Sequence, residues 1–210
     1  MAIAKKSVLT TGYVVRLAAL CTVLLIMTFT PLGYLSVGAL SMSLCVIPVA
    51  IGAIVLGALG GTLLGALFGI SSFIQALMGR DFGPILLEVS PLLTAFACII
   101  PRVLEGLLTS LIFKAMRKNR YSRPFSFETA ALCTALLNAL LFIGALCLLF
   151  WNEYIVPMVA TPENGLTATD YLPVISAVLS LVLLQAIIET LLCTVIGGAI
   201  AKALTIKKRL

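Results

Sequence analysis

The sequence predicts an all-α membrane protein with six transmembrane helices and both termini in the cytoplasm. Of its 210 residues, 61% are hydrophobic and only 10% are charged. The apolar residues come in long runs, which are typical of membrane-spanning helices of about 20 residues each. A chain of this length holds at most about six or seven crossings. Because no room is left for a soluble catalytic domain, we expect residues 1–210 to form a single transmembrane domain.

The apolar runs place the six helices in order along the chain. The first run follows a few cations and precedes a proline loop rather than a cleavage site, so we expect a retained helix and not a signal peptide. The second run is short and contains Pro48, which also allows a re-entrant segment. Connecting loops are expected at 30–43, 79–90, 117–124 and 151–171, with a glycine turn at 57–61 and Ser126 as a possible helix cap. The predicted helices are Gly12–Phe29, Leu44–Leu56, Thr62–Met78, Pro91–Met116, Ser126–Phe150 and Leu172–Leu204.

The cations predict which way the chain faces. Six crossings put both termini on one side, and twelve of the 14 cations then fall on that side. Only Arg80 falls on the opposite side, and Arg102 lies within a span. The positive-inside rule therefore places both termini and the basic loop at 117–123 in the cytoplasm. This topology accounts for the net charge of +6 without a nucleic-acid partner.

Several classes of chemistry lack the residues they need. The six cysteines all fall inside apolar runs, form no CxxC pair, and are accompanied by no histidine, so we expect neither a metal site nor a haem. The sequence contains no nucleotide-binding loop and no Ser/His/Asp set. We therefore expect a protein that is not an enzyme, uses no cofactor, and cannot use ATP without a partner.

Small residues recur at helical spacing on the third predicted helix and, as the shorter pair Ala18 and Thr22, on the first. Gly57, Gly61, Gly65 and Gly69 form one stripe on the third helix, which lets another helix approach closely. The stripe indicates either an internal packing face or a docking surface for a partner subunit.

Polar residues lie about halfway along three of the predicted spans. Charged side chains at this depth cost at least about 2.5–3.5 kcal/mol each, and they usually face the bundle interior or a water-filled cavity. Pro101 adds to the site, because it leaves the carbonyl of Ala97 without its helical donor. The set comprises Arg102 and Glu105 on the fourth helix, Asn138 on the fifth, and Gln185 and Glu189 on the sixth.

This polar set has two interpretations. In one, Arg102, Glu105 and Glu189 form an internal ion-pair network. In the other, these groups bind a polar substrate that arrives from outside, joined by Gln75 near the outer end of the third helix. Aromatic residues of the long external loops, such as Tyr34, could then cover the site or serve as interfacial anchors. The charges leave the sign of the substrate open, because Arg102 favours an anion and the two acids favour a cation.

Three segments resemble the substrate-binding membrane subunit (S-component) of an energy-coupling factor (ECF) vitamin transporter. They are Phe29–Gly57, the glycine-striped GGTLLGALFGISS, and IIPRVLEGLLTSLIFKAM at Ile99–Met116. The resemblance implies a protein of the bacterial cytoplasmic membrane that captures a water-soluble vitamin under external loops. It also implies docking on a transmembrane coupling subunit driven by two ATPases, through an Ala-x-x-x-Ala pattern that is matched here by Ala18 and Thr22.

The resemblance is greatest to the pantothenate-type branch of this family. Pantothenate is an anion and would suit Arg102, whereas a pyridoxine-, riboflavin- or thiamin-related substrate is the alternative within the family. Two alternatives lie outside it: an autonomous ion-coupled carrier, in which Glu105 or Glu189 would titrate, and a structural subunit with no ligand.

Overall fold

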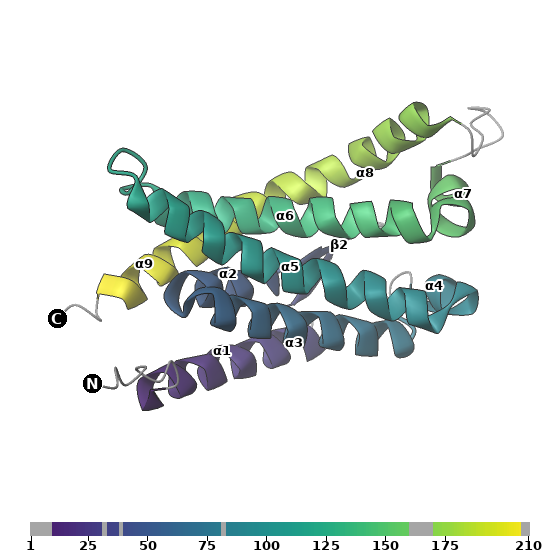
Figure 1. The fold of residues 1–210 in the computed structure, drawn as a ribbon. Coiled ribbons are helices and arrows are strands. Elements are labelled where there is room, and N and C mark those ends of the chain that lie inside the picture. The colour runs from purple at the N-terminus through teal and green to yellow at the C-terminus, as the bar shows by residue number, and fades with distance from the viewer. Residues whose placement is uncertain (1–9, 31–32, 38–39, 81–82, 160–169, 207–210) are drawn as a thin grey trace, which may run out of the picture.

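The computed structural model describes residues 10–30, 33–37, 40–80, 83–159 and 170–206. The described chain folds into a bundle of helices whose long axes run in roughly the same direction (Figure 1). The start of α1 (Thr11–Phe29), the turn at 119–125 and the end of α9 (Gly198–Ile206) lie at one end, which we call the basic end. The short helices α4 (Gly83–Val89) and α7 (Val156–Val159) lie at the opposite end.

The helical membrane architecture predicted from the sequence is confirmed. Within the described residues, five helical stretches are long and apolar enough to cross a bilayer. They are Thr11–Phe29 in α1, Gly57–Leu77 in α3, Pro91–Lys118 in α5, Ser126–Leu149 in α6, and Gln185–Thr205, which runs from α8 (Tyr171–Leu192) into α9.

A short helix, α2 (Val46–Val55), makes the sixth pass of the bundle. Its 10 residues span only about 15 Å, which is half of the hydrocarbon core. All of its residues except Val55 are buried, so α2 is an internal helix rather than a lipid-facing one. The short length expected for this segment is therefore observed, and α2 by itself is too short to cross the bilayer.

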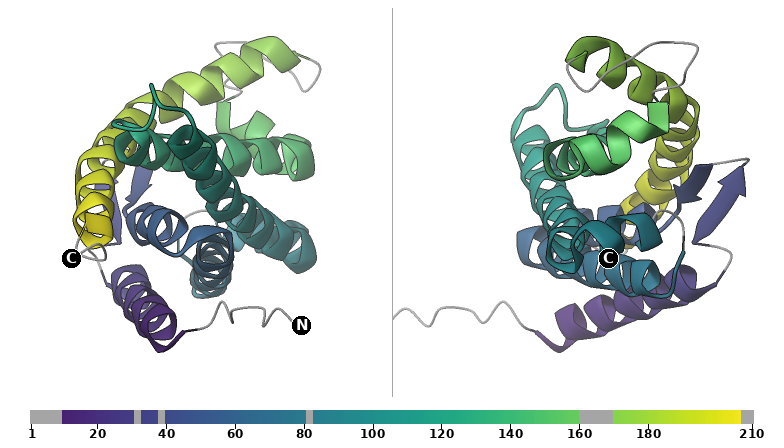
Figure 2. Two further views of the ribbon diagram at one scale, coloured as in Figure 1. Left: turned by 60° about the vertical axis from the view of Figure 1, so that its left-hand side comes forward. Right: turned by 90° about the vertical axis from the view of Figure 1, so that its right-hand side faces the viewer.

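A β-hairpin directly precedes α2, within the stretch 30–43 that was expected to be a loop. Strands β1 (Tyr34–Val37) and β2 (Leu40–Ser43) pair antiparallel, and the hairpin lies beside the last long helix (Figures 1 and 2). Apolar residues and serines alternate along β2 and over the last three residues of β1, a period-two pattern that the loop interpretation overlooked. The N–H of Leu44 donates to the carbonyl of Gly33 over 2.9 Å, which closes the base of the hairpin directly before α2.

The glycine stripe is an internal packing face, not a docking surface. Helix α3 begins at Gly57, earlier than expected, because a positive φ of 78° at that residue turns the chain sharply out of α2. Gly61, Gly65 and Gly69 are buried against α5, and a Cβ on any of them would overlap α5 backbone. The stripe therefore brings the α3 and α5 backbones into close contact.

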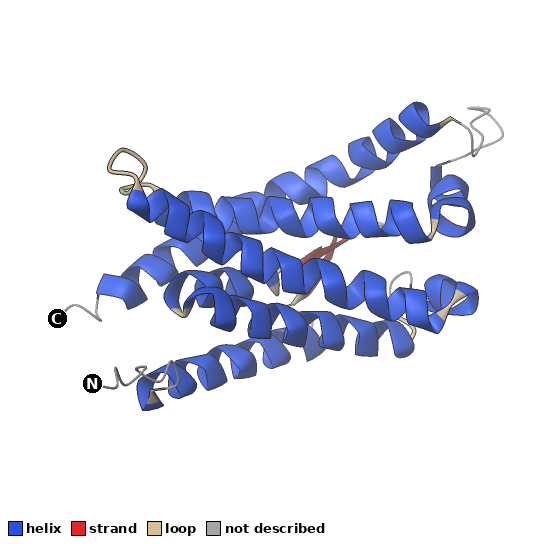
Figure 3. Ribbon diagram, viewed as in Figure 1, coloured by secondary structure: helices blue, strands red, loops and turns tan. Residues whose placement is uncertain are grey.

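Two of the expected loops, 79–90 and 151–171, and the last helix also differ from expectation. The segment 79–90 contains α4, and the segment 151–171 contains a π-helical turn, η1 (Trp151–Ile155), followed by α7. The last helix is interrupted by a second π-helical segment, η2 (Cys193–Gly197), between α8 and α9. Ser126 begins α6 rather than capping it, and its hydroxyl donates to the carbonyl of Arg123 over 2.9 Å. Figure 3 shows that helix makes up most of the described chain.

Buried apolar side chains form two separate cores. The first surrounds α2 and includes Leu64 and Phe68 of α3 together with residues of α1 and α6. The second joins α5, α6, η1 and α8 towards the opposite end, and Phe142 of α6 packs against it. The candidate site lies where these two cores meet, because Arg102 touches a side chain of each.

Candidate functional site

Arg102 is held by a backbone carbonyl that Pro101 leaves free within α5. Pro101 has no N–H, so the carbonyl of Ala97 lacks its usual partner within α5. The Arg102 Nη1 donates to that carbonyl over 3.1 Å. The acceptor left free by the proline thus turns the guanidinium back along the helix and fixes its position.

Two aromatic rings from other helices sandwich this guanidinium. Its central carbon lies 4.1 Å from the ring centroid of Phe142 on α6 and 5.3 Å from that of Phe68 on α3. Cation–π contacts of this kind are strongest where water is excluded, and Arg102 is only 6% exposed. Gly65 packs against the Arg102 backbone and so sets the distance between α3, which carries Phe68, and α5.

Glu105 lies one turn further along α5 and is fully buried. Neither of its carboxylate oxygens has a hydrogen-bond partner, and the Nε of Arg102 has none either. In the part of the chain that the structure describes, Arg102 forms no ion pair with Glu105 or Glu189. The first of the two interpretations, a network of direct ion pairs, is therefore not observed among the described residues, although the charges of all three groups interact at longer range.

Glu189 has local partners instead. Its Oε1 accepts a hydrogen bond from Asn138 Nδ2 at 2.9 Å, and the carboxylate also accepts one from the Ser43 backbone. These contacts connect α8, α6 and the end of the hairpin. The Oδ1 of Asn138 is buried and has no partner among the described residues, so this oxygen can still accept a hydrogen bond.

The remaining predicted binding residues lie around this centre. Gln185 is half-buried one turn before Glu189 on α8. The backbone of Tyr34 lies in β1, but its side chain falls outside the described residues. Gln75 is buried on α3, and its Nε2 donates to the carbonyl of Thr28 at the end of α1. Gln75 thus belongs first to the contact between α3 and α1, and no described contact links it to Arg102.

The Thr28 cluster nevertheless borders the site. The hydroxyl of Thr28 lies 3.5 Å from both Cys45 Sγ and Ser71 Oγ. Cys45 precedes α2 and lies within electrostatic range of Arg102 and Glu189. The beginning of α2 therefore approaches the centre of the bundle beside the charged residues.

Four contributors to the site were not predicted from the sequence: Phe68, Phe142, Ser43 and Cys45. The two phenylalanines look like ordinary apolar residues of their spans, and nothing in their spacing marks them as partners of an arginine. A position one turn after Gly65, on a stripe facing the Arg102 helix, is the one signal that could have indicated Phe68.

The expected docking residues face outward. Ala18 and Thr22 are exposed on α1, and the Thr22 hydroxyl donates to the carbonyl of Ala18 over 3.0 Å. Large apolar side chains such as Val15 and Ile26 are exposed on the same helix. This helix therefore offers an apolar surface to lipid or to a protein partner.

The chemistry available at the centre is that of polar recognition. Among the described residues, the buried polar atoms of the site without a protein partner are one donor, Arg102 Nε, three acceptors, the two Glu105 oxygens and Asn138 Oδ1, and the Ser43 hydroxyl, which can do either. Leaving such groups unpaired costs about 1–3 kcal/mol each, and more for charged groups. Within the described residues, no group of three or more His, Cys, Asp or Glu side chains is placed to hold a metal ion.

Comparison with known proteins places the whole bundle in one group. A family model described as ECF transporter, substrate-specific component, matches residues 13–200. No curated protein gives a significant match to the chain.

Proposed function

The chain belongs to the ECF transporter substrate-specific component family, and on this premise we propose that it captures a water-soluble vitamin, with pantothenate favoured, at the extracellular face. Proteins of this family bind a small substrate in the membrane and work with a coupling subunit and ATPases, rather than acting as enzymes. In this proposal, residues 1–210 form one substrate-binding domain in the bacterial cytoplasmic membrane. The basic end faces the cytoplasm, as the positive-inside rule favours.

The observation that carries the proposal is the set of unpartnered polar atoms around Arg102. Apolar cores on both sides exclude water from these atoms, so a bound molecule with complementary groups would recover the free energy lost by burying them. Such a molecule must carry both an acceptor for Arg102 and donors for Glu105 and Asn138.

Pantothenate has this combination of groups. Its carboxylate is an acceptor for the guanidinium edge of Arg102 that the Ala97 carbonyl leaves open. Its hydroxyl and amide N–H groups are donors for the Glu105 oxygens and Asn138 Oδ1. Because Glu189 already accepts hydrogen bonds from Asn138 and Ser43, its charge opposes an anion less than an unpartnered carboxylate would.

The other predicted residues have supporting roles in this proposal. Gln185 extends the polar surface one turn beyond Glu189 on α8. Gln75 anchors the end of α1 from which the hairpin starts, and Tyr34 lies on that hairpin. The hairpin is the described element best placed to cover the substrate, since its second strand contacts α8 and leads into α2 beside Cys45.

Calorimetry on the purified full chain tests the substrate. Pantothenate, pyridoxine, riboflavin and thiamin are titrated separately at equal concentration. We expect pantothenate to bind with 1:1 stoichiometry and at least about 100-fold more tightly than the other three, because it alone of the four carries a carboxylate, which can accept two hydrogen bonds from a guanidinium edge. Tighter binding of another vitamin would reassign the substrate, and binding of none of the four would contradict the vitamin proposal.

An autonomous ion-coupled carrier is the second candidate, favoured by the buried carboxylate of Glu105. Transporters often use acids at mid-depth as proton relays. Vesicles containing only the purified chain separate the two functions. We expect no uphill uptake of the bound vitamin under a proton or sodium gradient, whereas gradient-driven accumulation without any ATPase would favour the carrier.

We place the coupling contact on the exposed α1 face at Ala18 and Thr22. A large side chain there would hold a partner helix away. The variant Ala18→Trp should lose co-purification with the coupling subunit and retain vitamin binding. Leu179→Trp, on the exposed face of α8, is the matched control, and equal behaviour of the two variants would argue against this assignment.

A further inference from the structure

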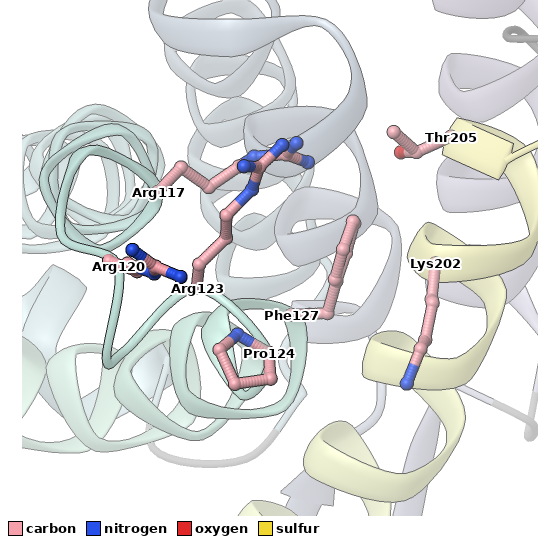
Figure 4. Close-up of a pocket in the computed structure, with 7 residues that line it drawn as sticks. All are labelled: Arg117, Arg120, Arg123, Pro124, Phe127, Lys202 and Thr205. Carbon is pink, nitrogen blue, oxygen red and sulfur yellow. The ribbon is translucent and has the colours of Figure 1, made fainter.

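A polar cavity lies at the basic end of the bundle, separate from the Arg102 site. Its volume is about 390 Å³, and it lies between the turn after α5, the start of α6 and the end of α9 (Figure 4). Its lining contains four cations and no acid. The lining residues are Arg117, Arg120, Arg123, Pro124, Phe127, Lys202 and Thr205.

The cavity is ordered by its own contacts. The guanidinium of Arg117 lies 5.6 Å from the ring centroid of Phe113 and 5.7 Å from that of Phe127, whose centroids are 5.2 Å apart. The turn itself is closed by a hydrogen bond of 2.8 Å from the Ser122 hydroxyl to the carbonyl of Met116. An anion would therefore meet at least one cation, Arg117, whose position is already restricted, which lowers the entropic cost of binding.

Positive charge in the cavity is only partly compensated. Lys202 forms an ion pair with Glu128 at 3.1 Å, and both side chains are substantially exposed. Among the described residues, none of the three arginines of the cavity forms an ion pair. Such clusters of cations beside a membrane attract anionic groups, and arginine in particular binds phosphate oxygens through two hydrogen bonds.

The surroundings of the cavity indicate where that anion comes from. The three helical elements that border it are the ends of apolar spans, so the cavity lies at a membrane boundary. Tyr121 and Phe125, in the same turn, are 89% and 68% exposed. Exposed aromatic side chains beside cations are typical of the headgroup region of a bilayer. The Pro124 and Phe127 side chains add an apolar wall that suits the glycerol and upper acyl part of a lipid.

We propose that the cavity lined by Arg117, Arg120, Arg123 and Lys202 binds the phosphate of an anionic phospholipid from the cytoplasmic leaflet. The inference rests on the orientation given under the proposed function, but not on the identity of the vitamin. A bound lipid would tie the turn after α5 to the end of α9 at the membrane surface.

Native mass spectrometry on the full chain in detergent tests this proposal. The chain is titrated with phosphatidylglycerol and with phosphatidylcholine of the same acyl chains. A triple variant, Arg117→Gln, Arg120→Gln and Arg123→Gln, is compared with a control that removes three cations outside the cavity, Arg16→Gln, Lys114→Gln and Lys118→Gln. We expect the cavity variant to bind phosphatidylglycerol roughly 100-fold more weakly, at about a fivefold loss for each of the three cations, and the control to change by less than about 5-fold. Calorimetry with the vitamin, run on every variant, shows that the fold is intact.

Four outcomes would overturn the proposal. The first is equal binding of the two lipids, and the second is an equal loss in the control variant, which would indicate diffuse surface attraction. A third is binding of soluble glycerol phosphate as tightly as phosphatidylglycerol, which would make the site one for free phosphate compounds. The last is unchanged lipid binding combined with lost co-purification of the coupling subunit in the cavity variant, which would make the surface a protein contact. Failure of vitamin binding in the unaltered chain would concern the proposed function alone.

Discussion

Two arginines on α5 are each held over a pair of phenylalanine rings, yet their surroundings differ. Arg102 lies between Phe68 and Phe142, and Arg117 lies over Phe113 and Phe127. Fifteen residues, or about 22 Å of helix, separate the two arginines. Arg102 is 6% exposed and has two buried acids in electrostatic range, whereas Arg117 is half-buried and lines a cavity with three other cations.

The difference shows that the aromatic pair positions a guanidinium without choosing its ligand. At Arg102, dry apolar cores and unpartnered acceptors favour a molecule with both donors and acceptors. At Arg117, neighbouring cations and an opening at the membrane boundary favour an anion of high charge density, such as phosphate. One helix can therefore use the same contact, an arginine beside two phenylalanine rings, for two different ligands.

The largest expected effect is the loss of the buried guanidinium. Arg102→Gln should weaken vitamin binding by about 2–5 kcal/mol, or roughly 30- to 3,000-fold, because it removes a desolvated charged hydrogen-bond donor. Calorimetry measures the change, and phosphatidylglycerol binding should stay unchanged. Arg80→Gln, an exposed arginine at the opposite end, is the control. If Arg102→Gln unfolded at a much lower temperature while the remaining folded protein bound normally, Arg102 would be structural.

A change at Gly65 should displace Arg102 and leave the position of Arg117 unchanged. A Cβ there would overlap the Arg102 backbone, so Gly65→Ala should destabilise the protein by about 3 kcal/mol, and it should also weaken vitamin binding. Thermal unfolding measures the loss. Gly144→Ala, where a Cβ meets nothing within 4 Å, should instead be neutral or stabilising by up to about 1 kcal/mol. Equal effects of the two changes would mean that the α3–α5 contact does not position the site.

Exchanging one ring at each arginine should separate the two sites. Phe142→Leu should weaken vitamin binding by about 2 kcal/mol, roughly 30-fold, since the cation–π contact there is desolvated. Phe113→Leu, at the more exposed arginine, should reduce phosphatidylglycerol binding by only about 2- to 5-fold. Each variant serves as the control for the other. A loss of both ligands in either variant would indicate a global change rather than a local one.

The smallest expected effect is at the one ion pair among the described residues. Glu128→Gln frees Lys202 to face the basic cavity, so phosphatidylglycerol binding should rise by about 2-fold. The effect is small because both side chains are exposed and screened. Glu88→Gln, exposed at the opposite end, should leave lipid binding unchanged. A decrease in lipid binding on Glu128→Gln would mean that the pair holds Lys202 in place for the lipid.

Local features of the site could be predicted from the sequence, and contacts between helices could not. The Pro101–Arg102 pair correctly indicated a free carbonyl at Ala97 beside a buried guanidinium. The contact of Phe113 with Arg117, four residues later on the same face of α5, is also local in the sequence, although it was not predicted. By contrast, Gln75 was expected beside Arg102 but bonds to the end of α1, because depth along a span says nothing about which neighbour a side chain faces.

The hairpin illustrates the same limit. Its alternating pattern lies in a stretch with a proline and two glycines, and this composition favoured the loop interpretation. Pairing of β1 with β2 and contact with α8 decide its structure. The hydrogen bond from the Ser43 backbone to Glu189 depends on that pairing and is invisible in the sequence.

The sequence by itself determined that this chain is a helical membrane protein, how many times it passes through the bundle, where the cations gather, and the depth of Arg102. Each of these follows from comparing a stretch of chain with the bilayer, and apolar length and charge are local properties. Only the tertiary structure decided which rings hold each arginine, which acid is left without a partner, and that the turn after α5 and the end of α9 enclose a basic cavity. The physical reason is that helix rotation and offset are set by packing, here by the backbone contact at the α3 glycines, and packing depends on all the helices at once.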